Sequence, residues 1–230
     1  MDCLVSNEVL RIVGGLVFLL LLVFIWVSRT AVQVKVDDYD NGGMALQRSG
    51  KSETVKQVVG EKNDPVRERL REGLRVDYVF IFSYAALFAA LGLVFSQTHV
   101  SGAKLLGLGA VVFILGAAAF DLCENSKIFE LLALDKESID DSLCRSVFIV
   151  STLKWLLFFL TAASLAVIFI KLWNWYSVIG LLMALGAVVG IAGIFSHKLI
   201  PPAVITLSLG VFILGLILIA APQKIMRLIC

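Results

Sequence analysis

Long apolar stretches dominate this sequence and decide what it can fold into. A bilayer core about 30 Å thick requires about 20 apolar residues in a helix. Six stretches approach this length, at residues 12–27, 78–95, 105–123, 147–170, 177–195 and 201–221. Backbone groups must pair internally in lipid, so such stretches cross a membrane as helices. The sequence therefore predicts an all-α fold, a polytopic transmembrane helix bundle of about six spans.

The composition agrees with a membrane protein and excludes several other classes. Hydrophobic residues make up 59% of the 230 residues and charged residues 17%, whereas about 25% of a soluble chain is charged. This depletion of charge excludes a disordered protein and an ordinary soluble enzyme. A formal net charge of +2 gives no field that attracts nucleic acid, so we expect no nucleic-acid partner. Cys3, Cys123, Cys144 and Cys230 are too scattered for a zinc site.

The apolar and polar stretches divide the chain into four parts. Residues 1–27 form a first transmembrane span, residues 28–76 a polar loop, residues 77–222 a five-span bundle and residues 223–230 a short basic tail. The first span has the position of a signal peptide. No small-residue cleavage site follows it, however, and Trp26 suits a membrane interface, so we expect an uncleaved span.

The polar loop is expected to contain one amphipathic helix. Asp64 and Pro65 are typical of the N-cap and the first position of a helix, and Val66, Leu70 and Leu74 then recur on one face. This helix is expected to continue into the second span. The charges around its other faces alternate in sign, which favours a solvated face over a face that docks on lipid or a partner.

Two shorter segments are expected to lie outside the regular spans. The sequence Asn41-Gly42-Gly43 is typical of a flexible loop. The apolar run at residues 128–134 is too short to cross a bilayer, so we expect it at the membrane interface.

The distribution of Lys and Arg predicts the orientation of the chain. The loops on the side of residues 28–76 hold fifteen of the 20 Lys and Arg residues, and the opposite side holds five. Basic loops stay in the cytoplasm. We therefore expect the 28–76 loop to be cytoplasmic and both termini to lie outside.

Small residues indicate where the spans pack against one another. Lipid provides little hydrophobic drive between helices, so close helix contacts are enriched in Gly and Ala. The fifth span carries the motif Gly186-x-x-x-Gly190. Six spans offer many internal partners, so we expect these glycines to serve packing within the chain; a homodimer face is the alternative, and the oligomeric state stays open.

Six polar residues lie near the predicted cytoplasmic ends of the second, third and fourth spans. They are Asp77, Tyr84, Asp121, Glu124, Asn125 and Lys154. An ionisable group exposed to hydrocarbon costs about 2.5–3.5 kcal/mol, so each needs a partner or water. We predict an ion pair between Lys154 and Asp121, with Asp77 and Glu124 nearer the water.

Some of these residues belong to motifs that carry a resemblance. The sequence Asp77-x-x-Phe80-Ile81-x-x-Tyr84 on one span precedes Asp121-x-x-Glu124-Asn125 at the end of the next, and Lys154-Trp155 follows on a later span. This pattern resembles a family of uncharacterised bacterial multi-pass membrane proteins. The resemblance covers the second to fourth spans and implies an inner-membrane location, but it implies no reaction.

Three classes of function fit these features. The polar cluster could tie helix ends together in a structural or assembly protein that binds a partner through the 28–76 loop. It could relay an ion or solute in a small carrier, or bind a lipid headgroup or metal. The sequence contains no nucleophile elbow, metalloprotease motif, P-loop or kinase signature, so the features lean away from an enzyme, although an enzymatic form of the headgroup or metal module stays open and the cofactor is unknown.

Overall fold

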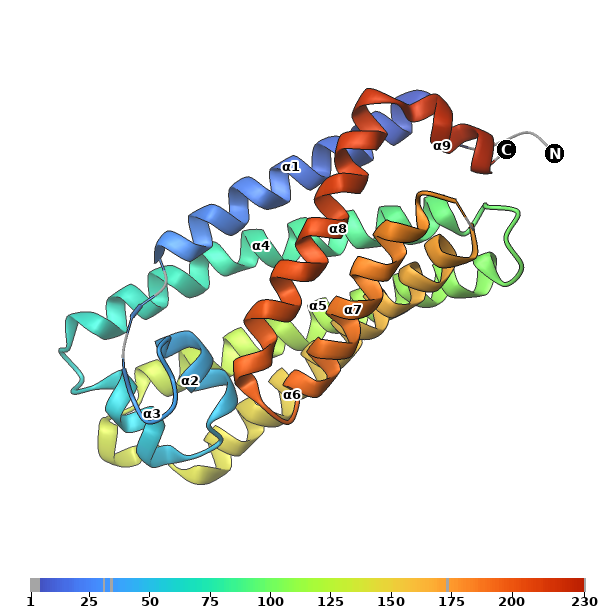
Figure 1. Cartoon of the computed structure of the whole chain (residues 1–230). Coiled ribbons are helices and arrows are strands. Elements are labelled where there is room, and N and C mark those ends of the chain that lie inside the picture. The colour runs from blue at the N-terminus through green and yellow to red at the C-terminus, as the bar shows by residue number, and fades with distance from the viewer. Residues whose placement is uncertain (1–4, 31, 34, 173, 230) are drawn as a thin grey trace. The chain divides into compact units, whose positions relative to one another are not determined.

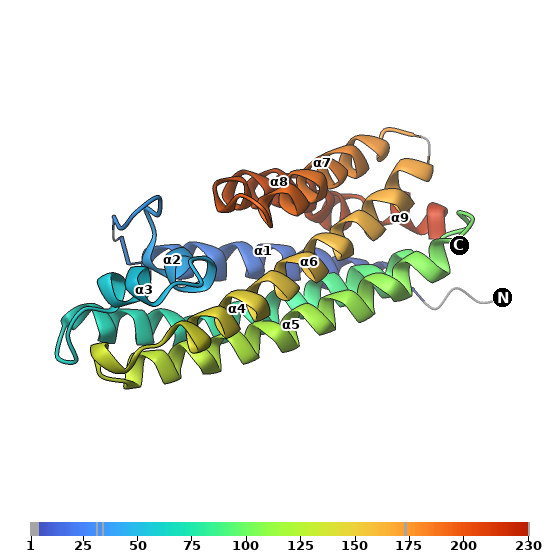
Figure 2. The same ribbon diagram turned by 90° about the horizontal axis from the view of Figure 1, so that it is seen from below.

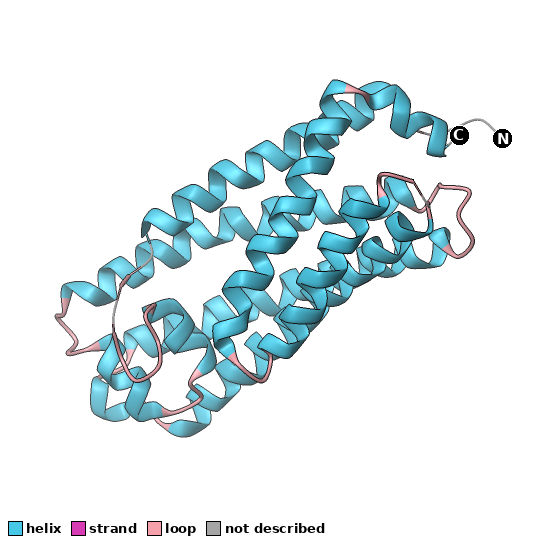
Figure 3. Cartoon of the chain, viewed as in Figure 1, coloured by secondary structure: helices cyan, strands magenta, loops and turns pink. Residues whose placement is uncertain are grey.

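The structure is a computed structural model that describes residues 5–30, 32–33, 35–172 and 174–229. Cys3 and Cys230 lie outside these ranges. Within them the regular elements are helices, joined by short loops (Figure 1, Figure 3). They are α1 (Asn7–Thr30), α2 (Gly42–Arg48), α3 (Ser52–Val59), α4 (Pro65–Phe95), α5 (Ala103–Ala133), η1 (Lys136–Ser138), α6 (Asp141–Lys171), α7 (Ser177–Gly193), η2 (His197–Leu199), α8 (Ile200–Ala220) and α9 (Pro222–Ile229). The predicted all-α fold is confirmed.

Five helices among the described residues are long and apolar enough to cross a membrane. They are Asn7–Thr30, Pro65–Phe95, Ala103–Ala133, Asp141–Lys171 and His197–Ala220. The predicted fifth span is the apolar helix α7, which has 17 residues and a length of about 25 Å. It is therefore shorter than the about 30 Å of a bilayer core. The described residues thus hold five helices of spanning length and one shorter apolar helix, as expected of a helical membrane protein.

The start of α4 follows the capping chemistry predicted from the sequence. Asp64 accepts a hydrogen bond from the backbone amide of Val66 at 2.9 Å, and its carbonyl accepts from the amide of Arg67 at 3.0 Å. Pro65 occupies the first helical position, where no amide donor is needed. The helix then runs without a break to Phe95, so the amphipathic segment and the second span form one helix, as predicted.

The chain divides into two compact units. The long helices α1, α4, α5 and α6 each contribute residues to both units. The first unit comprises the described residues of Met1–Leu21, Ser83–Ala117 and Trp155–Cys230. The second comprises those of Leu22–Phe82 and Ala118–Lys154.

In the first unit, α7 and α8 lie side by side, and glycines allow the close contact (Figure 1, Figure 2). A Cβ added to Gly186 would lie 3.1 Å from the carbonyl oxygen of Ala203 on α8. A Cβ added to Gly190 would overlap the ring of Phe159 on α6. Both glycines of the predicted packing motif therefore contact helices of the same chain.

The second unit contains a folded cap, which we define as the described residues from 32 to 64 (32–33 and 35–64) and which includes α2 and α3. A buried core joins the cap to the end of α5 and the start of α6. Its members are Val36, Ala45, Leu46, Val55, Val58, Val59, Leu70, Ile128, Leu131, Leu132, Ile139, Cys144 and Val147. This core gives the polar loop a fixed structure.

One prediction about a segment of the second unit is wrong, and another is not tested. The Asn41-Gly42-Gly43 sequence does not form a flexible loop: the Asn41 side chain caps α2 by accepting from the amides of Gly43 and Met44 at 2.8 and 3.3 Å. The run at residues 128–134 belongs mostly to the last turns of α5, where Ile128, Leu131 and Leu132 are buried against the cap. Its expected position at the membrane interface stays a prediction.

The amphipathic part of α4 is less solvated than its alternating charges predicted. Arg67 is only 1% exposed. Its guanidinium donates to the carbonyl oxygens of Leu132, Leu134 and Gly60 at 3.2, 2.6 and 3.0 Å. Arg71 donates to the same Leu132 carbonyl at 2.8 Å. These carbonyls belong to the end of α5 and the cap, so this face docks within the chain.

Candidate functional site

The predicted polar residues on α5 share one face of the helix. Asp121, Glu124 and Asn125 are spaced at i, i+3 and i+4, so their side chains project in nearly the same direction. All three are buried in the second unit. The span of α5 predicted from hydropathy ends at Cys123, but the helix continues to Ala133 and is covered there by the cap. These polar groups therefore lie inside the protein.

Lys154 on α6 is bonded to two of these carboxylates. Its ammonium lies 3.0 Å from Asp121 Oδ1 and 2.7 Å from Glu124 Oε1. The three residues are 6%, 5% and 0% exposed, respectively. The predicted pair of Lys154 with Asp121 is present. The prediction that Glu124 lies nearer the water is wrong, because Glu124 is the most deeply buried member and the nearer partner of the ammonium.

A second polar link joins α5 to α4. The side-chain amide of Asn125 donates to Asp77 Oδ2 at 2.8 Å. Asn125 is fully buried, while Asp77 is half-buried. The helices α4, α5 and α6 are thus connected in series through Asn125 and Lys154.

Tyr84, the remaining residue predicted for this cluster, belongs to the first unit. It is buried there, and its ring meets that of Phe158 edge to face at 5.8 Å between centroids. Its inclusion in the cluster stays a prediction.

Two residues of the site were not predicted. Ser151 is buried beside Glu124, three residues before Lys154 on the same face of α6, and that spacing was the signal that could have identified it. Arg48, at the end of α2, is 5% exposed and donates to the hydroxyl of Thr152 at 2.7 Å. Its guanidinium also lies 4.7 Å from the centre of the Phe148 ring. No sequence pattern marks Arg48, because α2 has only seven residues.

The cap places a second positive charge near the cluster. Burial lowers the pKa of Arg48, while the nearby Tyr39 and Glu124 act to raise it. Burial also raises the pKa of Tyr39, and the charge of Arg48 opposes that shift. An Arg side chain stays charged in proteins. Glu124 therefore lies in the field of both Lys154 and Arg48.

The cluster as a whole has more acids than bases. Three carboxylates, those of Asp77, Asp121 and Glu124, face Lys154 and the field of Arg48. Glu124 Oε2 and Asn125 Oδ1 are buried and make no hydrogen bond of good geometry with the described residues. In the described part of the chain, no group of three or more His, Cys, Asp or Glu side chains is arranged to hold a metal ion. The observed contacts are ion pairs and hydrogen bonds between helices.

Comparison with known proteins adds no further assignment. No protein-family model, curated protein or solved structure matches the chain. The resemblance carried by the motifs around Asp77, Asp121 and Lys154 therefore stays a prediction, and the function is argued from the site alone.

Proposed function

We propose that this protein is a structural and interaction component of a membrane, in which the buried cluster holds three spans in register and the cap binds a protein partner. The observation that supports this function best is the contact of Lys154 with both Asp121 and Glu124. An ammonium shared by two carboxylates is already satisfied by its own chain. Such an arrangement favours the fixing of helix ends over the binding of a substrate.

The attachment of the cap supports the same function. Arg48 bonds to α6, and Arg67 of α4 bonds both to Gly60 of the cap and to the end of α5. The backbone amide of Ser52 at the start of α3 donates to Asp141 of α6 at 2.8 Å. Through these bonds the cap is tied directly to α6, and through Arg67 to α5, the helices that hold the cluster. A cap held in this way presents a rigid surface, and a rigid surface loses little conformational entropy when a partner binds.

The proposed side of the membrane follows from the basic residues. Ten of the 20 Lys and Arg residues lie in residues 28–76, so we place the cap in the cytoplasm with both termini outside. We propose a bacterial inner membrane as the location, which the resemblance described above implies. A cysteine substituted for the exposed Lys62 of the cap tests the orientation. A membrane-impermeant maleimide should label it in inverted vesicles and not in intact cells, after the native cysteines have been replaced. Labelling in intact cells would contradict the orientation.

The partner is tested by photo-crosslinking from the cap in intact cells. Glu53 and Gln57 are exposed and lie one turn apart on α3, so a photoreactive residue at either position should give the same discrete adduct. Ser196, which is exposed between α7 and α8, is the matched control and should give none. The Arg48→Met variant, which loosens the cap, should reduce the adduct. Identical adducts from all three positions, or none from α3, would refute a partner site on the cap.

A small cation or proton carrier is the second candidate, and the charge excess of the cluster favours it. Three carboxylates face one buried lysine, and two buried oxygens lack a partner among the described residues. Proteoliposomes that contain a pH-sensitive dye distinguish the two functions. A structural component gives no proton flux above that of empty vesicles. Flux that the Glu124→Gln variant abolishes would replace the structural proposal with the carrier.

A further inference from the structure

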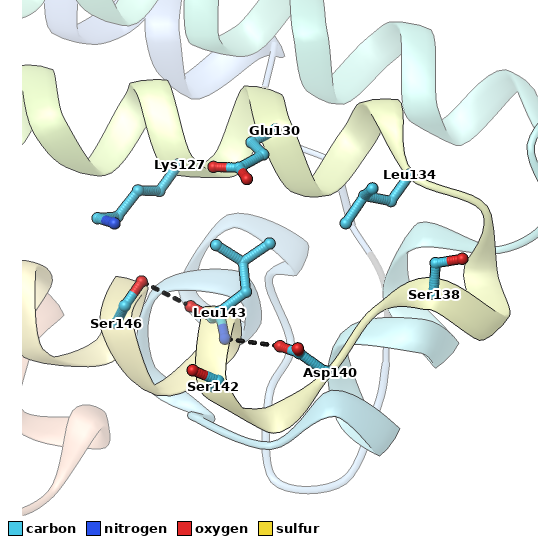
Figure 4. Close-up of a pocket in the computed structure, with 8 residues that line it drawn as sticks. All are labelled: Lys127, Glu130, Leu134, Ser138, Asp140, Ser142, Leu143 and Ser146. Atoms are coloured by element: carbon cyan, nitrogen blue, oxygen red, sulfur yellow. Dashed lines mark hydrogen bonds between the residues drawn. The ribbon is translucent and has the colours of Figure 1, made fainter.

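A polar hollow lies between the last turns of α5 and the first turns of α6 in the second unit. It has a volume of about 410 Å³, within the usual range for ligand pockets (Figure 4). Lys127 and Glu130 of α5 project toward α6, where Ser142 and Ser146 form the opposite wall. Asp140 lies at the same wall and accepts from the amide of Leu143 at 2.8 Å.

Lys127 and Glu130 each carry a charge with no partner among the described residues. Neither forms an ion pair or a hydrogen bond with the described residues. Some neighbouring charges of this unit pair across elements, as Lys62 does with Asp135 at 2.9 Å and Lys136 with Glu61 at 3.1 Å. The hollow thus holds one available cation and one available anion on adjacent turns of a helix.

A second hollow of about 410 Å³ adjoins the first around the same turns of α6. Ser142 and Ser146 line both, and Arg145, Asp141 and Ile149 line the second. Asp141, Arg145 and Ile149 are spaced at i, i+4 and i+8, so they follow one face of the helix from polar to apolar.

This change of polarity places the hollows at the membrane surface. Ile149 is 51% exposed although it is a large hydrophobic residue. After Arg145, the only ionisable side chain of α6 before Lys171 is the buried Lys154. The boundary between headgroups and acyl chains therefore falls between Arg145 and Ile149. A lipid bound with its headgroup in the hollows has its acyl chains beside Ile149.

We propose that the two hollows bind the headgroup of a zwitterionic phospholipid that carries a primary ammonium, of the phosphatidylethanolamine class. Lys127 and Arg145 suit the phosphate, while Glu130 and the free oxygen of Asp140 suit the ammonium. The lining has three acids and two bases, which disfavours an anionic headgroup. The residues that line the hollows include no aromatic side chain, so they offer no cage for a quaternary ammonium such as choline.

The test measures lipid binding by the full-length protein purified in detergent. Native mass spectrometry of mixed micelles with equimolar phosphatidylethanolamine, phosphatidylcholine and phosphatidylglycerol should show preferential adducts of the ethanolamine lipid. The same lipid should raise the melting temperature by about 3 °C or more at tenfold excess over its Kd. Equal binding of the three lipids would show only an unspecific lipid annulus and would overturn the proposal.

Two substitutions separate the roles of the two charges. Glu130→Gln should weaken binding of the ethanolamine lipid about tenfold and leave binding of the choline lipid unchanged, because only the ammonium contact is lost. Lys127→Gln should weaken binding of the ethanolamine lipid and of the choline lipid alike, because both lipids carry the phosphate. Glu72→Gln, an exposed glutamate of α4 outside the hollows, is the matched control. Unchanged selectivity in Glu130→Gln would overturn the proposal.

The source of the headgroup is tested with the water-soluble glycerophosphoethanolamine. A membrane lipid gains affinity from its acyl chains, so the soluble headgroup should stabilise the protein far less than the lipid does at the same concentration. Equal stabilisation by the two would show a ligand taken from water and would overturn the membrane source. All three side chains are at least partly exposed, so the variants are expected to fold, which an unchanged melting temperature without added lipid confirms.

Discussion

Replacement of Lys154 by methionine tests whether the buried cluster stabilises the fold. The substitution preserves most of the side-chain volume and removes the ammonium that lies 2.7 Å from Glu124 and 3.0 Å from Asp121. Two buried carboxylates then lose their partner. Removal of one member of a buried ion pair costs about 3–5 kcal/mol, because the other charge is left uncompensated. We expect Lys154→Met to lose at least this much of the free energy of unfolding.

Neutralisation of Glu124 or Asp121 should lower the free energy of unfolding by less than Lys154→Met does. The two losses should also differ in a predictable order. After Glu124→Gln, the ammonium still contacts Asp121, and after Asp121→Asn it still contacts Glu124. Each variant should therefore lose about 1–3 kcal/mol, the range for a hydrogen bond to a charged group, with the larger loss at Glu124 because its contact is shorter and it is fully buried. The triple variant without any of the three charges should be more stable than Lys154→Met, since no unpaired charge is left.

The assay is reversible unfolding of the purified protein in mixed micelles, followed by circular dichroism at several denaturant concentrations. A double-mutant cycle on Lys154 and Glu124 gives their coupling energy, which we expect to exceed 1 kcal/mol. The reasoning is refuted if Lys154→Met changes the free energy of unfolding by less than about 0.5 kcal/mol, the usual limit for surface substitutions. It is also refuted if the triple variant is as unstable as Lys154→Met.

Three further predictions concern contacts outside the cluster. Arg67→Met removes the donor to the carbonyl oxygens of Leu134 and Gly60 and should destabilise the cap by about 3 kcal/mol or more, seen as faster amide hydrogen exchange in α2 and α3. Gly190→Ala should lower the melting temperature because its Cβ overlaps the buried Phe159 ring, whereas Gly15→Ala, which has open space, should be neutral or stabilising by up to about 1 kcal/mol. Asn41→Ala removes the side chain that caps the N-terminus of α2. This change should lower the free energy of unfolding by about 1 kcal/mol in the same assay.

The sequence predicted the long helices well because hydropathy and capping act over many residues. Apolar runs located the spans, and Asp64 with Pro65 located the start of α4. The pair of Lys154 with Asp121 followed from depth alone, since a lysine inside a span requires an acid at the same level.

There is a physical reason why the cap could not be predicted from the sequence. Its helices α2 and α3 have seven and eight residues, too few to show a clear period or to be stable without tertiary contacts. Without the cap, the end of α5 looked as if it faced water, so Glu124 was placed nearer the solvent. The same omission made Arg67 look solvated, because the carbonyls that it binds come from segments distant in sequence.

The location of the polar bonds explains how this unit reaches a single arrangement. Apolar side chains on spans in lipid are nearly as well solvated apart as together, so they specify the register of neighbouring helices only weakly. Directional bonds from buried charges specify it strongly, because any other register leaves a charge unpaired in a medium of low polarity. Lys154 sets α6 against α5, while Arg67 sets the start of α4 against the end of α5. Arg48 then sets the cap against α6 through its bond to Thr152.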